Sequence, residues 1–339
     1  ARLPYTFTRY LCSGVTSVVD VGGPMWNFKV REIAARTEEA PRVAVAGPLI
    51  STYAPEKLKT DDPAIIKAGT PEEARALAER ELAQKPDLVK IWFIRTGTAK
   101  LEDLVPVVKA AVEAAHARGV RVAVHATELE TAKAAVRAGC DILVHSVQDL
   151  PVDDEFIRLV KERNVIYTTT LIVYEGYTEV GTQNVELTDV ERACGDPQVI
   201  ASWNDLAKFT KQQPARRPAP EKVMLENLKR VQDAGIVVAA GTDAGNIGTL
   251  HGPSLHREFE LMAQAGLTPM QIIVAATQNA ARVFSPRPET GTVAAGKLAD
   301  LVILDENPLA DIRNARKISK VIKGGRVFER AQFLTAQTK

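Results

Sequence analysis

The chain has 339 residues, of which 45% are hydrophobic and 25% are charged, so it is long enough to bury a large core. Its 43 Lys and Arg residues balance 42 Asp and Glu residues, giving a formal net charge of +1. This balance argues against a strong electrostatic attraction to nucleic acid or to an anionic membrane. We therefore expect a small-molecule substrate and no nucleic-acid partner. No apolar run reaches the length of a membrane span, so we expect none, and we leave self-association as a homo-oligomer open.

The cysteines also restrict the class of protein. Cys12, Cys140 and Cys194 are odd in number, widely spaced and without a CxxC pair, which argues against a disulfide scaffold and against a cysteine-rich zinc module. The sequence begins at Ala1 rather than Met, so we expect that a leader or a further N-terminal segment could precede it. The compartment is left open: the protein could be cytoplasmic, periplasmic or secreted.

Short β-branched runs alternate with longer helical patterns, which is typical of βα units on a parallel sheet. Helical patterns cover residues 70–84 and 128–139, and another precedes the first strand. The predicted strands are 15–22, 42–47, 87–93, 120–126, 141–146, 165–171 and 236–244. A (β/α)8 barrel needs eight strands. We therefore predict an α/β fold of TIM-barrel type whose first strand is missing from this chain.

Two segments depart from this alternation. Residues 178–220 form a long polar connection that ends in "KQQPARRPAP", and we predict a lid over the carboxyl face of the barrel. After residue 287, short strand patterns with glycine turns predict a small β appendage. The expected organisation is a barrel over residues 1–287 and part of a composite β-sandwich over residues 288–339.

Polar side chains interrupt or end several of the apolar strands. Asp243 follows the strand "VVAAGT", Lys90 lies within "LVKIWF", and His125 and His145 close two consecutive strands. The carboxyl ends of barrel strands surround one opening, where such folds keep their chemistry. Two imidazoles and a carboxylate suit Zn²⁺ with one position open. Taken singly, each residue has a structural alternative: a helix cap for Asp243, a satisfied buried histidine, or a lysine paired with an acid.

Lys90 needs separate treatment, because a protonated ammonium group has no lone pair and cannot bind a metal ion. Burial between Val89 and Ile91 would lower its pKa. The neutral amine could then take up carbon dioxide and become a carbamate, whose oxygens resemble those of a carboxylate. Lys90 is therefore a candidate metal ligand only in this modified form.

The motifs "LVKI", "VAVHA", "LVHS" and "GTDAG" resemble those of the amidohydrolase superfamily, in particular its imidazolonepropionase-like and prolidase-like members. The segment "HREFELMAQAGLTPMQIIVAATQNAARVF" and the following "GTVAAGKLADLVILDENP" are similar to the end of that family's barrel and its return into a β-sandwich. The resemblance implies that Lys90 is a carboxylated bridging lysine, that His125 and His145 bind one metal ion, and that Asp243 binds the other and acts as general base.

The family also has an HxH pair on its first strand, and this sequence contains no HxH. One zinc ion is therefore expected, held by Lys90, His125 and His145, and the second site is doubtful. The resemblance further implies that Tyr174 and His251 contact the substrate, and we consider Arg95 as a partner for a substrate carboxylate.

These residues predict a metal-dependent hydrolase in which activated water attacks an amide carbonyl and Asp243 transfers the proton to the leaving nitrogen. The expected substrates are a dipeptide, an N-acyl amino acid or a cyclic amide. Two alternatives stay open: a metal-poor barrel that binds a small ligand without catalysis, and a deaminase on the same scaffold.

Overall fold

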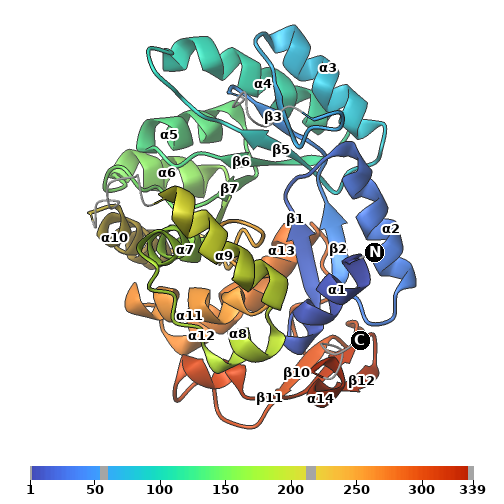
Figure 1. Cartoon of the computed structure of the whole chain (residues 1–339). Helices are drawn as coiled ribbons and strands as arrows, with labels where there is room; N and C mark the ends of the chain where they lie inside the picture. The colour runs from blue at the N-terminus through green and yellow to red at the C-terminus, as the bar shows by residue number, and fades with distance from the viewer. Residues whose placement is uncertain (1, 54–59, 211–218, 335–339) are drawn as a thin grey trace.

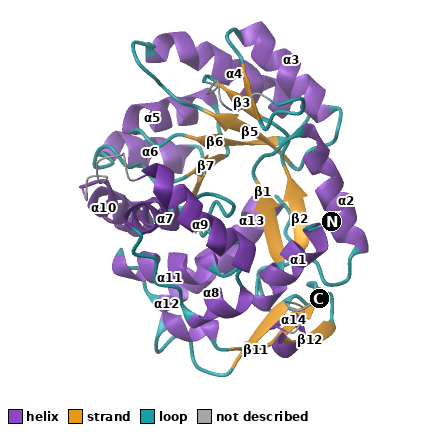
Figure 2. Cartoon of the chain, viewed as in Figure 1, coloured by secondary structure: helices purple, strands orange, loops and turns teal. Residues whose placement is uncertain are grey.

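The computed structural model describes residues 2–53, 60–210 and 219–334. Most of its strands lie at the centre with helices around them, and a small sheet near the C-terminus lies at one edge (Figures 1 and 2). Strand β1 (Ser17–Asp20) pairs in parallel with β2 (Arg42–Val45). A second, seven-stranded parallel sheet has the order β4-β3-β5-β6-β7-β8-β9. Its strands are β3 (Leu49–Ser51), β4 (Ile65–Lys67), β5 (Leu88–Trp92), β6 (Arg121–His125), β7 (Ile142–Val144), β8 (Ile166–Thr168) and β9 (Val238–Ala239).

The two parallel sheets are joined at the start of β5. The backbone amide of Asp87 donates to the carbonyl of Val45 at 3.0 Å, and the Asp87 carboxylate accepts from the Val45 amide at 2.9 Å. The inner faces form one cluster, which extends from β1 through β9 and includes Val19, Ala46, Leu88, Ala123, Ile142, Ile166 and Ala239. This arrangement is the interior of a TIM-type α/β barrel. The prediction of that fold class is confirmed.

All seven predicted strands are present, each shorter than predicted. Strands β3 and β4 were not predicted, because segments of three residues are too short to show a periodic pattern. The helices around the strands are α1 (Leu3–Cys12), α2 (Phe28–Arg36), α3 (Pro71–Leu82), α4 (Leu101–Ala117), α5 (Leu129–Ala138), α6 (Asp154–Glu162), α7 (Leu171–Thr182), α10 (Ala219–Asp233), α11 (Ser254–Gln264), α12 (Pro269–Val274) and α13 (Ala280–Phe284).

The helix ends follow from their local sequence. The Thr70 hydroxyl accepts the amide of Glu73 at 3.2 Å and so caps α3, which has proline in its first turn. Helix α5 ends at Gly139, whose φ of 102° is in the left-handed region that glycine adopts without strain. These two predicted helices are therefore present, as is the one predicted before the first strand, α1.

The long connection after β8 continues α7 into α8 (Asp189–Cys194) and α9 (Pro197–Thr210). Val180 and Trp203 pack against Leu250, in the loop that follows β9. The connection thus lies on the carboxyl side of the strands, as predicted for a lid. Residues 178–205 do not line the large cavity at that end, and the side chains of residues 206–220 lie outside the description.

The last part of the chain forms an antiparallel sheet of β10 (Leu301–Leu304), β11 (Ile318–Lys323) and β12 (Arg326–Glu329), followed by α14 (Arg330–Leu334). This sheet shares a hydrophobic cluster with α1 and α8, in which Leu11, Val190, Val321 and Phe328 are buried. An ion pair of 2.6 Å between Arg42 and Asp300 also joins it to β2. The sheet is therefore packed onto the barrel.

Cys12 of α1 and Cys194 of α8 form a disulfide, and Cys140 is buried and free. The cysteine pattern had argued against a disulfide scaffold. An odd number of distant cysteines does not exclude a single bridge, because the fold brings the two Cα atoms within 5.6 Å across 182 residues of sequence. Within the described ranges, no helix combines the length and the apolar character needed to cross a bilayer.

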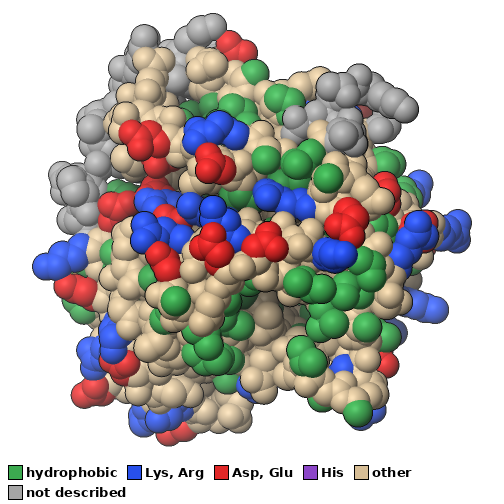
Figure 3. Space-filling model, turned by 90° about the horizontal axis from the view of Figure 1, so that it is seen from below, with side chains coloured by type: hydrophobic (Ala, Val, Ile, Leu, Met, Phe, Trp, Pro, Cys, Tyr) green, Lys and Arg blue, Asp and Glu red, His purple; other side chains and the backbone are tan. Residues whose placement is uncertain are grey.

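Hydrophobic side chains also reach the surface. Figure 3, which views the molecule from below the orientation of Figure 1, shows patches of them on both sides of a hollow. On the C-terminal sheet, Val302, Ile303 and Val327 are 38%, 44% and 51% exposed.

Candidate active site

A cavity of about 1360 Å³ opens among the strands, and the four residues predicted as metal ligands all line it. Lys90 is on β5, His125 ends β6, His145 directly follows β7, and Asp243 lies in the loop after β9. Parallel strands bring these residues to one opening although they span more than 150 positions in the sequence.

The two histidine rings lie against each other, with centroids 4.5 Å apart and planes at 70°. The Nδ1 atom of His145 is 2.6 Å from the hydroxyl of Thr170, which leaves Nε2 as the ring nitrogen for a ligand. Burial, together with the nearby Lys90, lowers the pKa of His145 to about 3. Burial, with His145 and Lys90 nearby, also holds the pKa of His125 well below its usual value. Both rings are neutral at pH 7 and keep a lone pair.

Lys90 is only 2% exposed, and its Nζ atom is buried without a hydrogen-bond partner. Burial lowers the pKa of this amine to about 8, and the Asp243 carboxylate opposes the change. A buried polar group without a partner costs about 1–3 kcal/mol. The unpartnered Lys90 amine therefore lowers the stability of the folded protein.

Asp243 has a φ of 50°, a left-handed conformation that is uncommon for residues other than glycine. The Asn246 side-chain amide donates to the Asp243 carboxylate at 3.2 Å, and the Thr249 hydroxyl donates to its carbonyl at 3.1 Å. A strained conformation held by its surroundings is common at functional sites.

Asp20, at the end of β1, also lines the cavity and was not predicted. Burial raises its pKa, hydrogen bonds from the Gly22 amide and from Asn27 lower it, and Asp243 raises it slightly. Asp20 follows the apolar run "VTSVV" as Asp243 follows "VVAAGT". The rule that singled out Asp243 would therefore have identified Asp20 as well.

The three predicted substrate contacts differ in position. Tyr174, on α7, and His251 both line the cavity, and burial lowers the pKa of His251. Arg95 is not among the lining residues: it pairs with Glu128 at 3.0 Å, and its side chain is 42% exposed. In the described part of the chain, no three His, Cys, Asp or Glu side chains group closely enough to hold a metal ion.

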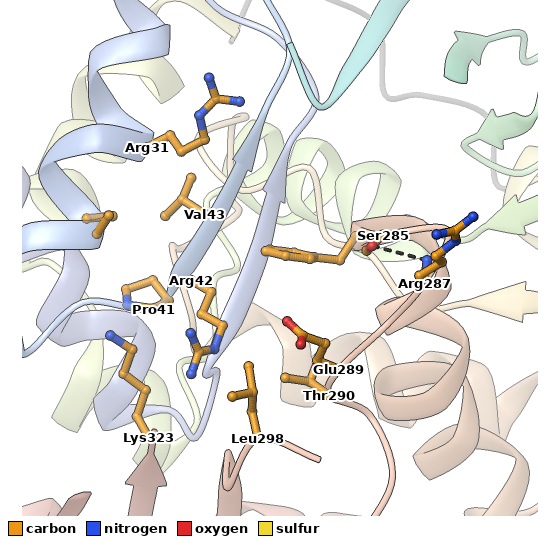
Figure 4. Close-up of a pocket in the computed structure, with 13 residues that line it drawn as sticks. Arg31, Pro41, Arg42, Val43, Ser285, Arg287, Glu289, Thr290, Leu298 and Lys323 are labelled. Carbon is orange, nitrogen blue, oxygen red and sulfur yellow. Dashed lines mark hydrogen bonds between the residues drawn. The ribbon is translucent and has the colours of Figure 1, made fainter. Parts of the chain in front are cut away.

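A second, smaller pocket of about 340 Å³ lies beside β2. Arg42 and Lys323 lie on one side with Glu289 facing them, while Arg31 and Arg287 point away (Figure 4). Arg42 is paired with Asp300, and Arg31 with Asp87 at 2.7 Å. Two of the four positively charged side chains that line this pocket are therefore already paired with carboxylates of the protein.

A family model described as "Amidohydrolase family" matches residues 1–328. The chain belongs to the amidohydrolase family. It is 30% identical over 200 residues to ochratoxinase of Aspergillus niger, an alignment that covers 58% of this chain and 35% of that protein. It is 39% identical over 80 residues to imidazolonepropionase of a Geobacillus species, covering 23% of this chain and 19% of that one. This amidohydrolase thus spans about a third or less of the length of these two curated relatives.

Solved structures agree on the fold. A putative prolidase from Bifidobacterium longum has a TM-score of 0.75 and 25% identity, covering 99% of this chain and 80% of that one. A Xaa-Pro dipeptidase with methionine bound in its active site has a TM-score of 0.73 and 22% identity, covering 96% and 77%. The family model confirms the predicted membership of this family.

Proposed function

We propose that this amidohydrolase cleaves an amide bond of a small substrate with the help of one divalent metal ion, zinc being the expected one. The observation that carries the proposal is the buried Lys90 amine, which has no hydrogen-bond partner. It lies near two neutral imidazoles and the Asp243 carboxylate. A neutral amine that adds carbon dioxide forms a new N–C bond and releases one proton to water. The resulting carbamate, with His125 and His145, would supply three ligands and leave one position open.

This donor set fits a metal ion only if Lys90 is modified, because no cluster of three His, Cys, Asp or Glu side chains occurs among the described residues. As an ammonium group, Lys90 would repel the ion. When bound, the ion would polarise the substrate carbonyl and lower the pKa of a water molecule. Asp243 would accept the proton of the attacking water and pass it to the leaving nitrogen.

The walls of the cavity would orient the substrate. Tyr174 and His251 would donate hydrogen bonds to its carbonyl or carboxylate oxygens. Arg95 would have to leave Glu128 to reach a substrate carboxylate. The names of the relatives include a dipeptidase, a prolidase and an ochratoxinase, so we propose dipeptides and N-acyl amino acids as the first substrates to test. A cyclic amide belongs to the same proposal.

The test combines metal analysis with hydrolysis of a panel of Xaa-Pro dipeptides and N-acetyl amino acids. Wild-type protein is expected to retain zinc after dialysis, and Lys90→Ala to lose both zinc and hydrolysis. Lys90→Glu, which provides a shorter carboxylate, should recover part of the zinc binding. Lys109→Ala is the control, because Lys109 is 61% exposed on α4.

The results also separate the two alternatives. Ligand binding without zinc or hydrolysis would favour the metal-poor binding barrel. Ammonia release from an amino-substituted ring, with no amide cleavage, would favour the deaminase. Zinc retention by Lys90→Ala would exclude the proposed ligand set.

A further inference from the structure

The loop that carries Asp243 is held by its own backbone. Within residues 243–249, the amide of Gly245 donates to the carbonyl of Thr249 at 3.3 Å, and the amide of Asn246 donates to the carbonyl of Asp243 at 3.2 Å. These bonds fix the path of the chain. They do not fix the rotation of the Asp243 side chain, which needs partners of its own.

Asn246 supplies one such partner. Its Nδ2 atom donates to Oδ2 of Asp243 at 3.2 Å, while its Oδ1 atom accepts from the Ile247 amide at 2.9 Å and from the hydroxyl of Tyr177. An amide side chain has one acceptor end and one donor end. The Ile247 amide can only donate and the Asp243 carboxylate only accepts, so the NH₂ end of Asn246 must face Asp243. A flipped Asn246 would lose both of these bonds.

Tyr177 reaches Asn246 because α7 lies directly on this loop. A Cβ atom on Gly176 would be 2.8 Å from the carbonyl oxygen of Ile247, and one on Gly248 would overlap the Cα of Gly176. Gly248 also has a φ of 78°, which favours glycine. The two glycines let the helix and loop backbones touch, so that the phenol at the next position is within reach of Asn246.

We infer that Tyr177 and Asn246 are positioning residues that hold the Asp243 carboxylate in one orientation in the cavity. The catalytic consequence of this positioning rests on the proposed function, in which Asp243 moves a proton. A carboxylate that rotates freely would spend less time in the geometry required for proton transfer, whereas the affinity for substrate would change little.

The first experiment compares crystal structures of wild type, Tyr177→Phe and Asn246→Ala. In Tyr177→Phe, which loses only the hydroxyl group, we expect the Asn246 side chain to shift from its position and the Asp243 carboxylate to rotate away from it. In hydrolysis of an Xaa-Pro dipeptide, kcat should fall on the order of tenfold in each variant, with KM nearly unchanged, the scale of one lost hydrogen bond. The double variant should lose little more than either single one, since both act through one chain of bonds.

A second comparison uses two glycines of α7. Replacing either glycine by alanine favours the helix, and nothing lies within 4 Å of a Cβ atom built on Gly181. Gly181→Ala should therefore keep wild-type kcat and melting temperature or better. Gly176→Ala should push α7 off the loop and lower kcat as Tyr177→Phe does.

An unchanged Asp243 side chain in the Tyr177→Phe crystal structure would overturn the inference, as would a kcat equal to wild type. If wild-type protein hydrolyses no substrate, the proposed function fails, and the crystal structures alone then decide whether Tyr177 and Asn246 position Asp243.

Discussion

Glu81, on α3, is a carboxylic acid inside the protein. It is 2% exposed, its Oε2 atom is buried without a hydrogen-bond partner, and a Cβ atom on Gly47 would be only 3.0 Å from its side chain. Burial raises the pKa of Glu81 to about 9, with Arg80 opposing the change. The acid is therefore neutral in the folded protein at pH 7 and ionised in the unfolded chain, where its pKa is about 4.3.

This difference predicts a pH-dependent stability. Because the folded pKa is raised, the contribution of Glu81 is fully present below pH 4 and is lost as the pH rises toward 9. Glu81→Gln, which cannot ionise, should equal wild type near pH 4 and exceed it by several kcal/mol at pH 8, because each unit of the pKa shift corresponds to about 1.4 kcal/mol. Urea unfolding at both pH values measures this, and a constant difference between the proteins would contradict it.

Asp243→Asn tests the proton transfer. The amide keeps the size of the side chain, so the fold and melting temperature should change little. We expect kcat for an Xaa-Pro dipeptide to fall by on the order of 10²-fold or more, the scale of lost general-base catalysis. Lys109→Ala, at an exposed position on α4, again provides the control. Full activity in Asp243→Asn would reject the role proposed for this carboxylate.

The strand-end rule was enough to predict that Lys90, His125, His145 and Asp243 lie around one cavity. It could not place Arg95, because a residue beyond a strand end can turn outward to a surface partner such as Glu128. The hydrogen bonds of Thr170 and Asn246 to site residues could not be predicted either, since they depend on loop geometry that periodicity does not encode.

Among the elements, long periodic segments were predicted well and short ones were missed. The helix α3 shows a full capping pattern in its sequence, whereas β4 has three residues and no signal of its own. The connection that contains α8 and α9 was recognised by its length, yet its attachment to α1 by Cys12–Cys194 was not. Pairings between distant residues depend on the whole fold, which local patterns do not contain.

The disulfide predicts a measurable stabilisation of α1 and α8. Cys12→Ser with Cys194→Ser should lower the free energy of unfolding by about 2–4 kcal/mol, the usual range for a native bridge. Urea denaturation measures the change. As a control on the pairing, unreduced protein in denaturant should show one free thiol, that of Cys140, and reduced protein all three. Three free thiols before reduction would contradict the bridge.

At the scale of the whole molecule, we expect the C-terminal sheet to unfold together with the barrel, because it shares a buried cluster with α1 and α8. Phe328 of β12 is 2% exposed in the cluster shared with α1 and α8, whereas its neighbour Val327 is 51% exposed. Phe328→Ala should cost about 3–5 kcal/mol, and Val327→Ala below 1 kcal/mol. Calorimetry should show one unfolding transition in each variant. The temperature of this transition should be lowered only in Phe328→Ala. A separate early transition in Phe328→Ala would mean that the sheet unfolds independently.

The large cavity has a calorimetric consequence. Its walls include Val144, Leu255, Phe259 and Ile273, so water inside it would wet a considerable apolar area. A ligand that fills the cavity would release that water to bulk solvent, and burial of apolar surface gives a negative change in heat capacity. Titration calorimetry at several temperatures should therefore show a binding enthalpy that becomes more favourable with warming, even for a ligand that is never cleaved.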